Sequence, residues 1–193
     1  MVRTRSPLTA LLAATLVCLL HAAVAAIDVK VEFDKTFDFK KVRTWAWNPD
    51  GAGGVRMART VLDDPEAMQR LAEPWILDAV ATEMTRLELT KTDTSPDVTM
   101  TYYLLLSTNF SGQSVGDFLP AVTAWALPPF APATQSLKLM NRGSLVLDLT
   151  AAGAVVWRGL AQTELRPHTE DKKKEAALRA GVRDLLRRYP VRP

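Results

Sequence analysis

Apolar and charged residues alternate from residue 28 to residue 34, with valine or phenylalanine at each odd position and a charged side chain at each even one. This period of two is typical of a β-strand that buries one face. Residues 43–47 hold two tryptophans and a threonine, which favour strands, and they predict a second strand. The run of Asn, Pro, Asp and Gly residues at 48–54 then predicts a flexible turn.

A helix start is predicted at Asp64 and Pro65, because aspartate suits the N-cap and proline suits the first helical position. Pro74 has no backbone N–H and is expected to divide the helical stretch that follows. The main helix is therefore predicted from about residue 75 to residue 87. Its apolar stripe is expected to face the core and consists of Ile76, Val80, Met84 and Leu87.

Two further strand patterns follow. Residues 98–106 are rich in valine, threonine, tyrosine and leucine, and they predict a largely buried strand at the centre of a sheet. Residues 145–149 and 155–161 predict a β-hairpin, with Ala152 and Gly153 between its strands.

Thr169 is expected to cap a closing helix that Pro190 ends. One face of this helix carries Leu178, Val182, Leu185 and Tyr189. The order of elements predicts an α+β domain with a single, mostly antiparallel sheet of about five strands. Two helices are expected to pack on one face of that sheet.

A long Pro-rich apolar insertion, residues 110–140, separates the central strand from the hairpin. Residues 118–137 include no charged side chain, and their four prolines argue against a membrane-spanning helix. The large apolar side chains Phe118, Trp125 and Phe130 allow two interpretations. The insertion is either a loop laid over an open face or edge of the sheet, or a docking surface for lipid or a partner.

Residues 1–26 have the three-part layout of a bacterial export signal. Arg3 and Arg5 are followed by an apolar run at residues 8–20 and then by small residues. The apolar run is shorter than the roughly 20 residues that a transmembrane helix needs. We therefore expect a cleaved signal peptide followed by a single exported domain at residues 27–193.

Small residues place the expected start of the exported chain at Ala26 or Ile27. Cys18 is the only cysteine, and a cysteine after an apolar run is also found in bacterial lipoproteins. Lipoprotein signals have a small residue before the cysteine, whereas Val17 stands here. A periplasmic protein without a thiol is thus expected, with anchoring through an acylated Cys18 as the alternative.

The apparent basicity of the chain comes from the expected signal. Removing Arg3 and Arg5 from the 24 Lys and Arg residues leaves 22, against 21 Asp and Glu, so net charge gives no reason to expect nucleic-acid binding. His168 is the one histidine outside the signal and is expected to be a solvated loop residue. No Gly-x-Ser-x-Gly or His-Glu-x-x-His motif is present, and no catalytic residue, metal or cofactor is predicted.

Two sets of charged residues still deserve a structural interpretation. Asp148 and Arg158 lie on the two strands of the hairpin, away from its leucine face, and predict a cross-strand ion pair. A polar anchor in a ligand groove is the alternative. Arg179, Arg183 and Arg187 recur every four residues and predict a solvated helix face that complements the helix dipole, with contact to anionic lipid as the alternative.

Five segments along the chain form a recognisable pattern. In order, they are Trp45-Ala46-Trp47, Pro96-Asp97-Val98, Gly143 to Leu149, Val156 to Gly159 and Tyr189-Pro190. In these segments the chain resembles the bacterial envelope family catalogued as domain of unknown function 4136. The resemblance implies a small exported α/β domain without an established activity. Many members are lipoproteins, and many have a Lys-Gly-Tyr-like helix end where this chain has Leu87-Glu88-Leu89.

These observations predict a non-catalytic domain of the bacterial cell envelope that binds a protein partner or helps to maintain the envelope. The alternative is a carrier or sensor of an apolar small molecule or lipid, bound through the insertion at residues 110–140. Phe118, Trp125, Phe130, Asp148 and Arg158 are the predicted ligand or partner surface. Peripheral contact with a membrane is compatible with either function.

Overall fold

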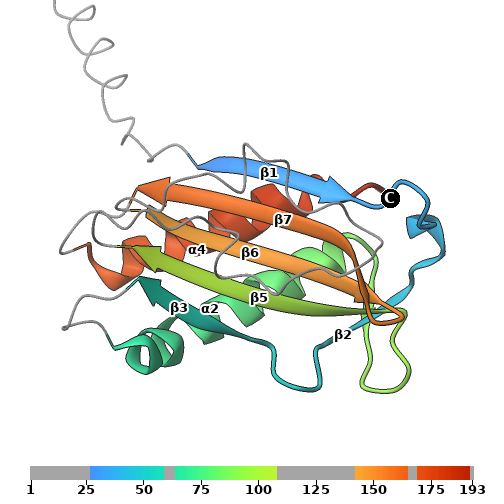
Figure 1. Ribbon diagram of the computed structural model, residues 1–193, viewed down its shortest axis with the longest axis horizontal. Helices are drawn as coiled ribbons and strands as arrows, with labels where there is room; N and C mark the ends of the chain where they lie inside the picture. The colour runs from blue at the N-terminus through green and yellow to red at the C-terminus, as the bar shows by residue number, and fades with distance from the viewer. Residues whose placement is uncertain (1–26, 59–63, 108–141, 165–168, 192–193) are drawn as a thin grey trace, which may run out of the picture.

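The computed structural model describes residues 27–58, 64–107, 142–164 and 169–191. The predicted export signal, the whole 110–140 insertion and His168 lie outside these residues. Within them, one twisted sheet is covered on one face by two helices, which lie behind the strands in Figure 1. This confirms the predicted placement of two helices on one face.

The sheet has seven strands in the order β1-β7-β6-β5-β2-β4, and β3 also pairs with β5. The strands are β1 (Asp28–Phe33), β2 (Thr44–Trp47), β3 (Gly53–Ala58), β4 (Thr90–Lys91), β5 (Val98–Ser107), β6 (Arg142–Ala151) and β7 (Ala154–Glu164). The helices are α2 (Pro65–Arg86) and α4 (Asp171–Leu186), with a short 3-10 helix, η2 (Phe39–Lys41), after β1. The strand β5 lies near the centre of the sheet, as predicted.

The prediction of a mostly antiparallel five-stranded sheet is wrong. β1, β7, β6 and β5 are antiparallel neighbours, but β2 and β3 both run parallel to β5, and β4 runs parallel to β2. The sheet is therefore mixed. The physical reason is α2, which carries the chain from the end of β3 back to the starting end of β5, as a parallel connection requires.

Strand β3 replaces the later part of the turn that was predicted for residues 48–54. Gly53 has a φ of 155°, and a Cβ atom at this position would clash with the backbone carbonyl and ring of Tyr102. The missing side chain thus allows β3 to approach β5 closely enough to pair with it. Asn48 to Gly51 still form a turn, in which the Gly51 N–H donates to the Asn48 carbonyl at 3.0 Å.

Helix α2 begins where the sequence predicts. The Asp64 carboxylate accepts hydrogen bonds from the backbone N–H groups of Glu66 at 2.9 Å and Ala67 at 3.1 Å. The predicted break at Pro74 is wrong, because the helix continues through this residue to Arg86. Pro74 is exposed, and burial of the apolar side of the helix outweighs the lost hydrogen bond; that side includes Ala72, Ile76, Ala79, Val80 and Met84.

Helix α4 packs its apolar side against β7 and α2. Val182 and Leu185 are fully buried, and Leu178 is half-buried. The predicted cap at Thr169 is wrong, because Glu170 is the N-cap residue and its side chain makes no capping hydrogen bond. The helix ends at Leu186, and Tyr189 follows it as a buried side chain on the same core.

The hairpin of β6 and β7 has the predicted position, with Ala152 at φ 48° and Gly153 at φ 81° in its turn. Its strands present large apolar side chains to the helices, and a Cβ atom at Gly159 would lie 2.8 Å from Leu185 Cδ2. Leu147 stands opposite Gly159 in the register and therefore also faces the helices. The alternate residues of both strands consequently point to the other face of the sheet.

Candidate functional site

The second face of the sheet, which is the side away from α2 and α4, holds the buried polar residues of the described chain. These residues are Thr101, Ser144, Asp148, Arg158 and Gln162, and their exposed fractions are 9% or less. They alternate along β5, β6 and β7 with apolar residues that face the helices. We call this set the buried polar row.

The centre of the buried polar row is the predicted ion pair between Asp148 and Arg158, which the structure confirms. The two residues stand directly opposite each other in the register of β6 and β7. Arg158 Nε donates to Asp148 Oδ1 at 2.6 Å, and Nη2 donates to Oδ2 at 2.5 Å. Both oxygens of the carboxylate are thus held by one guanidinium, in the bidentate geometry that arginine favours.

Burial and charge act in opposite directions on this pair. Burial raises the pKa of the Asp148 carboxyl, and the Arg158 guanidinium opposes that rise. Burial lowers the pKa of Arg158, but the hydrogen bonds and charge of Asp148 raise it overall, with smaller contributions from Tyr103 and Glu32. The guanidinium therefore stays charged, and it provides the carboxylate with a partner inside the protein.

Neighbouring strands extend the polar contacts across the sheet. Glu32 on β1 stands opposite Arg158, and Thr101 on β5 stands opposite Asp148. Asn48 Nδ2 donates to Thr101 Oγ1 at 3.3 Å. One line of polar side chains thus crosses the sheet from the edge strand β1 to the turn that follows β2.

A second polar contact lies one pair of residues along the hairpin. Gln162 Nε2 donates to Ser144 Oγ at 2.7 Å, and both residues are at most 2% exposed. Gln162 Oε1 is buried without a hydrogen-bond partner in the described chain. Like the ion pair, the hydrogen bond between Gln162 and Ser144 links β7 to β6 on the second face.

Phe118, Trp125 and Phe130, the apolar members of the predicted surface, lie outside the described residues. Of the predicted site residues, the structure therefore describes and brings together only Asp148 and Arg158. Thr101, Ser144 and Gln162 were not predicted. Their alternation with the leucines of β5 and β6 and the small residues of β7 is the sequence signal that points to the same face.

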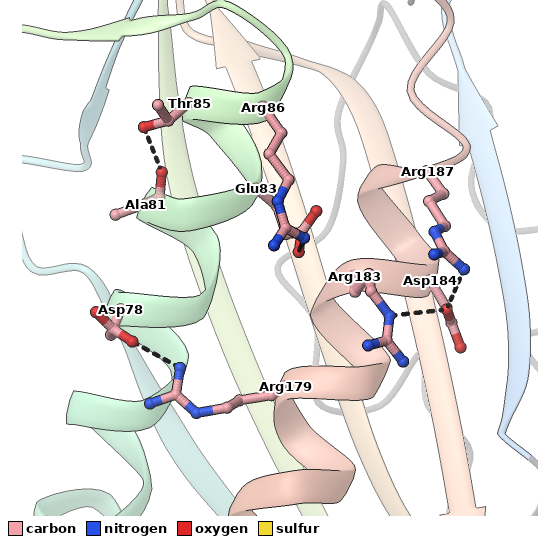
Figure 2. Close-up of polar contacts among 9 residues, drawn as sticks. All are labelled: Asp78, Ala81, Glu83, Thr85, Arg86, Arg179, Arg183, Asp184 and Arg187. Carbon is pink, nitrogen blue, oxygen red and sulfur yellow. Dashed lines mark hydrogen bonds and ion pairs between the residues drawn. The ribbon is translucent and has the colours of Figure 1, made fainter.

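The predicted arginines lie on α4 and at its C-terminal end, and Figure 2 shows acidic partners next to them, on α2 for Arg179 and on α4 for Arg183 and Arg187. Arg179 Nη1 donates to Asp78 on α2 at 2.6 Å, and its Nε donates to Glu175 at 2.8 Å. Arg183 and Arg187 both lie near Asp184, at 3.7 and 3.6 Å. The predicted arginine face is therefore largely solvated and balanced by carboxylates, and Arg179 also joins the two helices.

A shallow groove of about 300 Å³ lies along the first turns of α2 and is lined by Glu66, Gln69, Arg70 and Glu73. Tyr102 donates from its hydroxyl to Glu73 Oε2 at 3.1 Å, and Gln69 Nε2 donates to the same oxygen at 3.0 Å. Burial and the nearby Glu73 carboxylate raise the pKa of Tyr102. The four lining residues share one side of the helix, as their spacing of three and four residues indicates, but sequence reasoning missed them.

Several residues that carry the family resemblance have structural roles. Asp97 Oδ2 accepts from the N–H groups of Arg43 and Thr44, each at 2.8 Å, and from Thr44 Oγ1 at 2.9 Å. This carboxylate fixes the start of β2 beside β5. Trp157 is fully buried, and a Cβ atom at Gly159 would lie 2.6 Å from the Trp157 ring. Glycine at this position therefore makes room for the ring.

Across the described ranges, no helix is long and apolar enough to cross a membrane, and no group of three His, Cys, Asp or Glu residues could hold a metal ion. The contacts of the buried polar row join β6 to β7. The chemistry of the described site is thus that of a bidentate ion pair and hydrogen bonds inside a folded domain.

Comparison with solved structures finds distant similarities of the fold. The chain resembles a PDZ domain protein from Parabacteroides distasonis, with 15% identity and a TM-score of 0.49, over 88% of this chain and 38% of that one. It thus spans well under half of that protein. It also resembles a DUF4136 family protein from Bacteroides thetaiotaomicron, with 16% identity and a TM-score of 0.47, over 85% of this chain and 96% of that one.

A third similar structure is the PelC dodecamer from Paraburkholderia phytofirmans, with 9% identity and a TM-score of 0.36, over 83% of this chain and 95% of that one. No curated protein matches the chain. The model of the family described as "Domain of unknown function (DUF4136)" matches residues 29–191, which include every described strand and helix except the first residue of β1. The chain therefore belongs to the DUF4136 family.

Proposed function

We propose that this protein is a non-catalytic domain of the bacterial cell envelope that acts by binding another protein. The observation that carries the proposal is the bidentate pair of Asp148 and Arg158 inside the sheet. Both oxygens of the Asp148 carboxylate accept hydrogen bonds from the buried Arg158 guanidinium, so this carboxylate links β6 to β7. It is poorly suited to exchanging protons with a substrate.

Other polar groups support the same function. Asp97 holds the start of β2, Glu73 holds the Tyr102 hydroxyl, and Arg179 joins α4 to α2. Each of these groups is used within the fold and rigidifies the domain. A rigid domain presents a preformed surface to a partner, which lowers the entropic cost of binding.

The proposed location rests on the sequence of residues 1–26, with its two arginines, apolar run and small residues. Cleavage before Ala26 or Ile27 would release a periplasmic protein, whereas acylation of Cys18 would give an anchored lipoprotein. The intact mass of the protein purified from the envelope fraction distinguishes these outcomes. A full-length mass in the cytoplasmic fraction would contradict the proposed location.

Site-specific photocrosslinking in cells tests the proposed interaction. A photoreactive residue is placed separately at four exposed positions in different parts of the fold, which are Lys35 in the turn after β1, Arg70 on α2, Lys91 on β4 and Arg183 on α4. One or two of the four positions are expected to give a discrete crosslinked product of reproducible mass, because a specific partner covers part of the surface. Each position serves as a control for the others, since random collision would label all four alike.

Native mass spectrometry of the purified protein separates this proposal from a carrier of an apolar small molecule. A protein-binding domain is expected to show the mass of the polypeptide alone. A retained lipid-like compound, lost on unfolding, would contradict the proposal, as would the absence of crosslinked product at all four positions. Identification of the crosslinked protein then names the partner.

A further inference from the structure

Strand β1 forms one edge of the sheet. It pairs with β7 along its full length, from Asp28 opposite Gln162 to Phe33 opposite Trp157, and no described strand pairs with its other side. Figure 1 shows β1 as the outermost arrow, beyond β7. An edge strand presents backbone N–H and C=O groups that can pair with another strand.

The register decides which backbone groups point outward. The N–H of Asp34, just beyond the strand, donates to the Val156 carbonyl at 2.9 Å, so even-numbered residues direct their backbone groups toward β7. The odd-numbered residues Val29, Val31 and Phe33 therefore direct theirs outward. Arg188 Nη1 donates to the outward carbonyl of Val29 at 2.5 Å. A carbonyl oxygen has two lone pairs, so this oxygen can accept a second hydrogen bond from another strand.

The side chains of β1 carry a charge pattern suited to pairing with itself. Lys30 and Glu32 lie two residues apart on the second face of the sheet, and both are half-buried. Val29, Val31 and Phe33 lie on the helix-covered face and pack at the border of the core. In an antiparallel pair of two identical strands centred on Val31, each Lys30 stands opposite the Glu32 of the other strand.

We propose that a second copy of this chain adds its β1 to this edge, antiparallel and centred on Val31. The two sheets then become one continuous sheet across a twofold axis. Val31 pairs with Val31 of the second copy, and Val29 pairs with Phe33 of the second copy, so outward backbone groups meet outward backbone groups. Two reciprocal Lys30–Glu32 pairs flank the axis on the second face.

Other registers are less favourable for specific reasons. A shift by two residues places Glu32 opposite Glu32, or Lys30 opposite Lys30, and like charges across a strand pair are destabilising. A shift by one residue brings outward backbone groups opposite inward ones. Asp28 would face Asp34 in the preferred register, but the Asp34 carboxylate accepts from Thr36 in the turn after β1, so pairing ends at Phe33.

Charge exchange between two variants tests the register. Sedimentation equilibrium over a concentration series is expected to show a reversible dimer of the wild-type protein. Lys30→Glu is expected to raise the dissociation constant about tenfold, because it turns both attractive pairs into repulsive ones. Glu32→Lys is expected to do the same, whereas an equimolar mixture of the two variants should restore association, because opposite charges again face each other.

Lys35→Glu is the matched control. It makes the same charge change at an exposed residue beyond the end of β1 and is expected to leave the dissociation constant within about twofold. Circular dichroism and thermal melting confirm that each variant is folded, which matters for Glu32→Lys because Glu32 lies beside Arg158. A dimer that responds equally to Lys35→Glu and Lys30→Glu would overturn the proposal.

Disulfide crosslinking gives a second, independent measurement. In a Cys18→Ser background, Val31→Cys is expected to form an intermolecular disulfide under mild oxidation, because the twofold axis brings the two Cα atoms to roughly 5.5 Å. Lys35→Cys is expected to remain largely unlinked. A monomeric wild-type protein at every concentration, or equal crosslinking at both positions, would overturn the proposal. Self-association holds whether or not the protein also binds another envelope protein.

Discussion

The two faces of the sheet are built by different means. On the face covered by the helices, Leu147, Leu149 and Trp157 pack against α2 and α4, and all are fully buried. On the second face, Asp148 and Arg158 occupy equally buried positions of the same two strands. Apolar burial is non-directional, whereas a bidentate ion pair is satisfied in only one register.

The difference indicates a division of labour within the hairpin. The helix-covered face is apolar throughout the hairpin, and many apolar residues of similar size would serve there. On the second face, the buried apolar residues Leu105, Val146 and Leu160 alternate with the buried polar row. The second face selects the pairing of β6 with β7, because a slip by one residue would bury both charges apart from each other. On the second face, a second substitution that removes the remaining polar partner should therefore restore much of the free energy of unfolding that the first substitution loses.

The largest effect is expected for Asp148→Ala. It leaves the Arg158 guanidinium buried without its carboxylate and should lower the free energy of unfolding by about 3–5 kcal/mol. Urea denaturation followed by circular dichroism measures this change. The double variant Asp148→Leu/Arg158→Leu should recover most of the loss, because no buried charge remains.

A double variant as unstable as Asp148→Ala would contradict the interpretation that the loss comes from the unpaired charge. A fully stable Asp148→Ala protein would show that Arg158 finds another partner when the carboxylate is removed. Either result is visible in the same denaturation experiment.

Packing on the helix-covered face is tested by Gly159→Ala. The added methyl group would meet the Trp157 ring and Leu185 Cδ2, and this overpacking should cost about 1–3 kcal/mol of unfolding free energy. Gly54→Ala is the matched control, because the nearest atom to its added methyl group is Gln69 Oε1 at 3.9 Å. Equal thermal melting temperatures for the two variants would contradict the tight packing at Gly159.

The patterns that could be read from the sequence are those in which local preference and tertiary packing agree. The alternation in β1, the turn at Gly153 and the cap at Asp64 each follow from a few adjacent residues. Strand β3 could not be predicted in this way, since its glycines disfavour strands and its formation depends on close approach to Tyr102. The helix across Pro74 likewise depends on burial of its apolar side.

The order of elements in the sequence contains a signal for the mixed sheet. A strand, a helix and a second strand in succession favour a parallel crossover, and the long helix between β3 and β5 makes one. At the site, hairpin alternation was sufficient to bring Asp148 and Arg158 together. Burial of that pair was not predictable from the hairpin alone, because it depends on the whole second face.

The hydrogen bond between Ser144 and Gln162 provides a smaller test of the second face. Ser144→Ala removes the acceptor of the buried Gln162 amide and should cost about 1 kcal/mol of unfolding free energy. Ser144→Ala/Gln162→Leu should be close to the wild-type protein, because both polar partners are gone. A double variant that is less stable than Ser144→Ala would contradict this account, and urea denaturation measures all three proteins.

The smallest effect is expected at the exposed Asp97, outside both faces. The backbone N–H groups of Arg43 and Thr44 and the Thr44 hydroxyl lower its pKa below the ordinary value of 3.8. Because the folded state binds the proton less readily than the unfolded state, the carboxylate stabilises the fold above pH 3.8, and this contribution is lost as the pH falls through the lowered pKa. Asp97→Asn should therefore lower the melting temperature slightly at neutral pH, and the difference from wild type should shrink in acid. A difference that stays constant from neutral pH to below pH 3 would show that the Asp97 charge does not stabilise the start of β2.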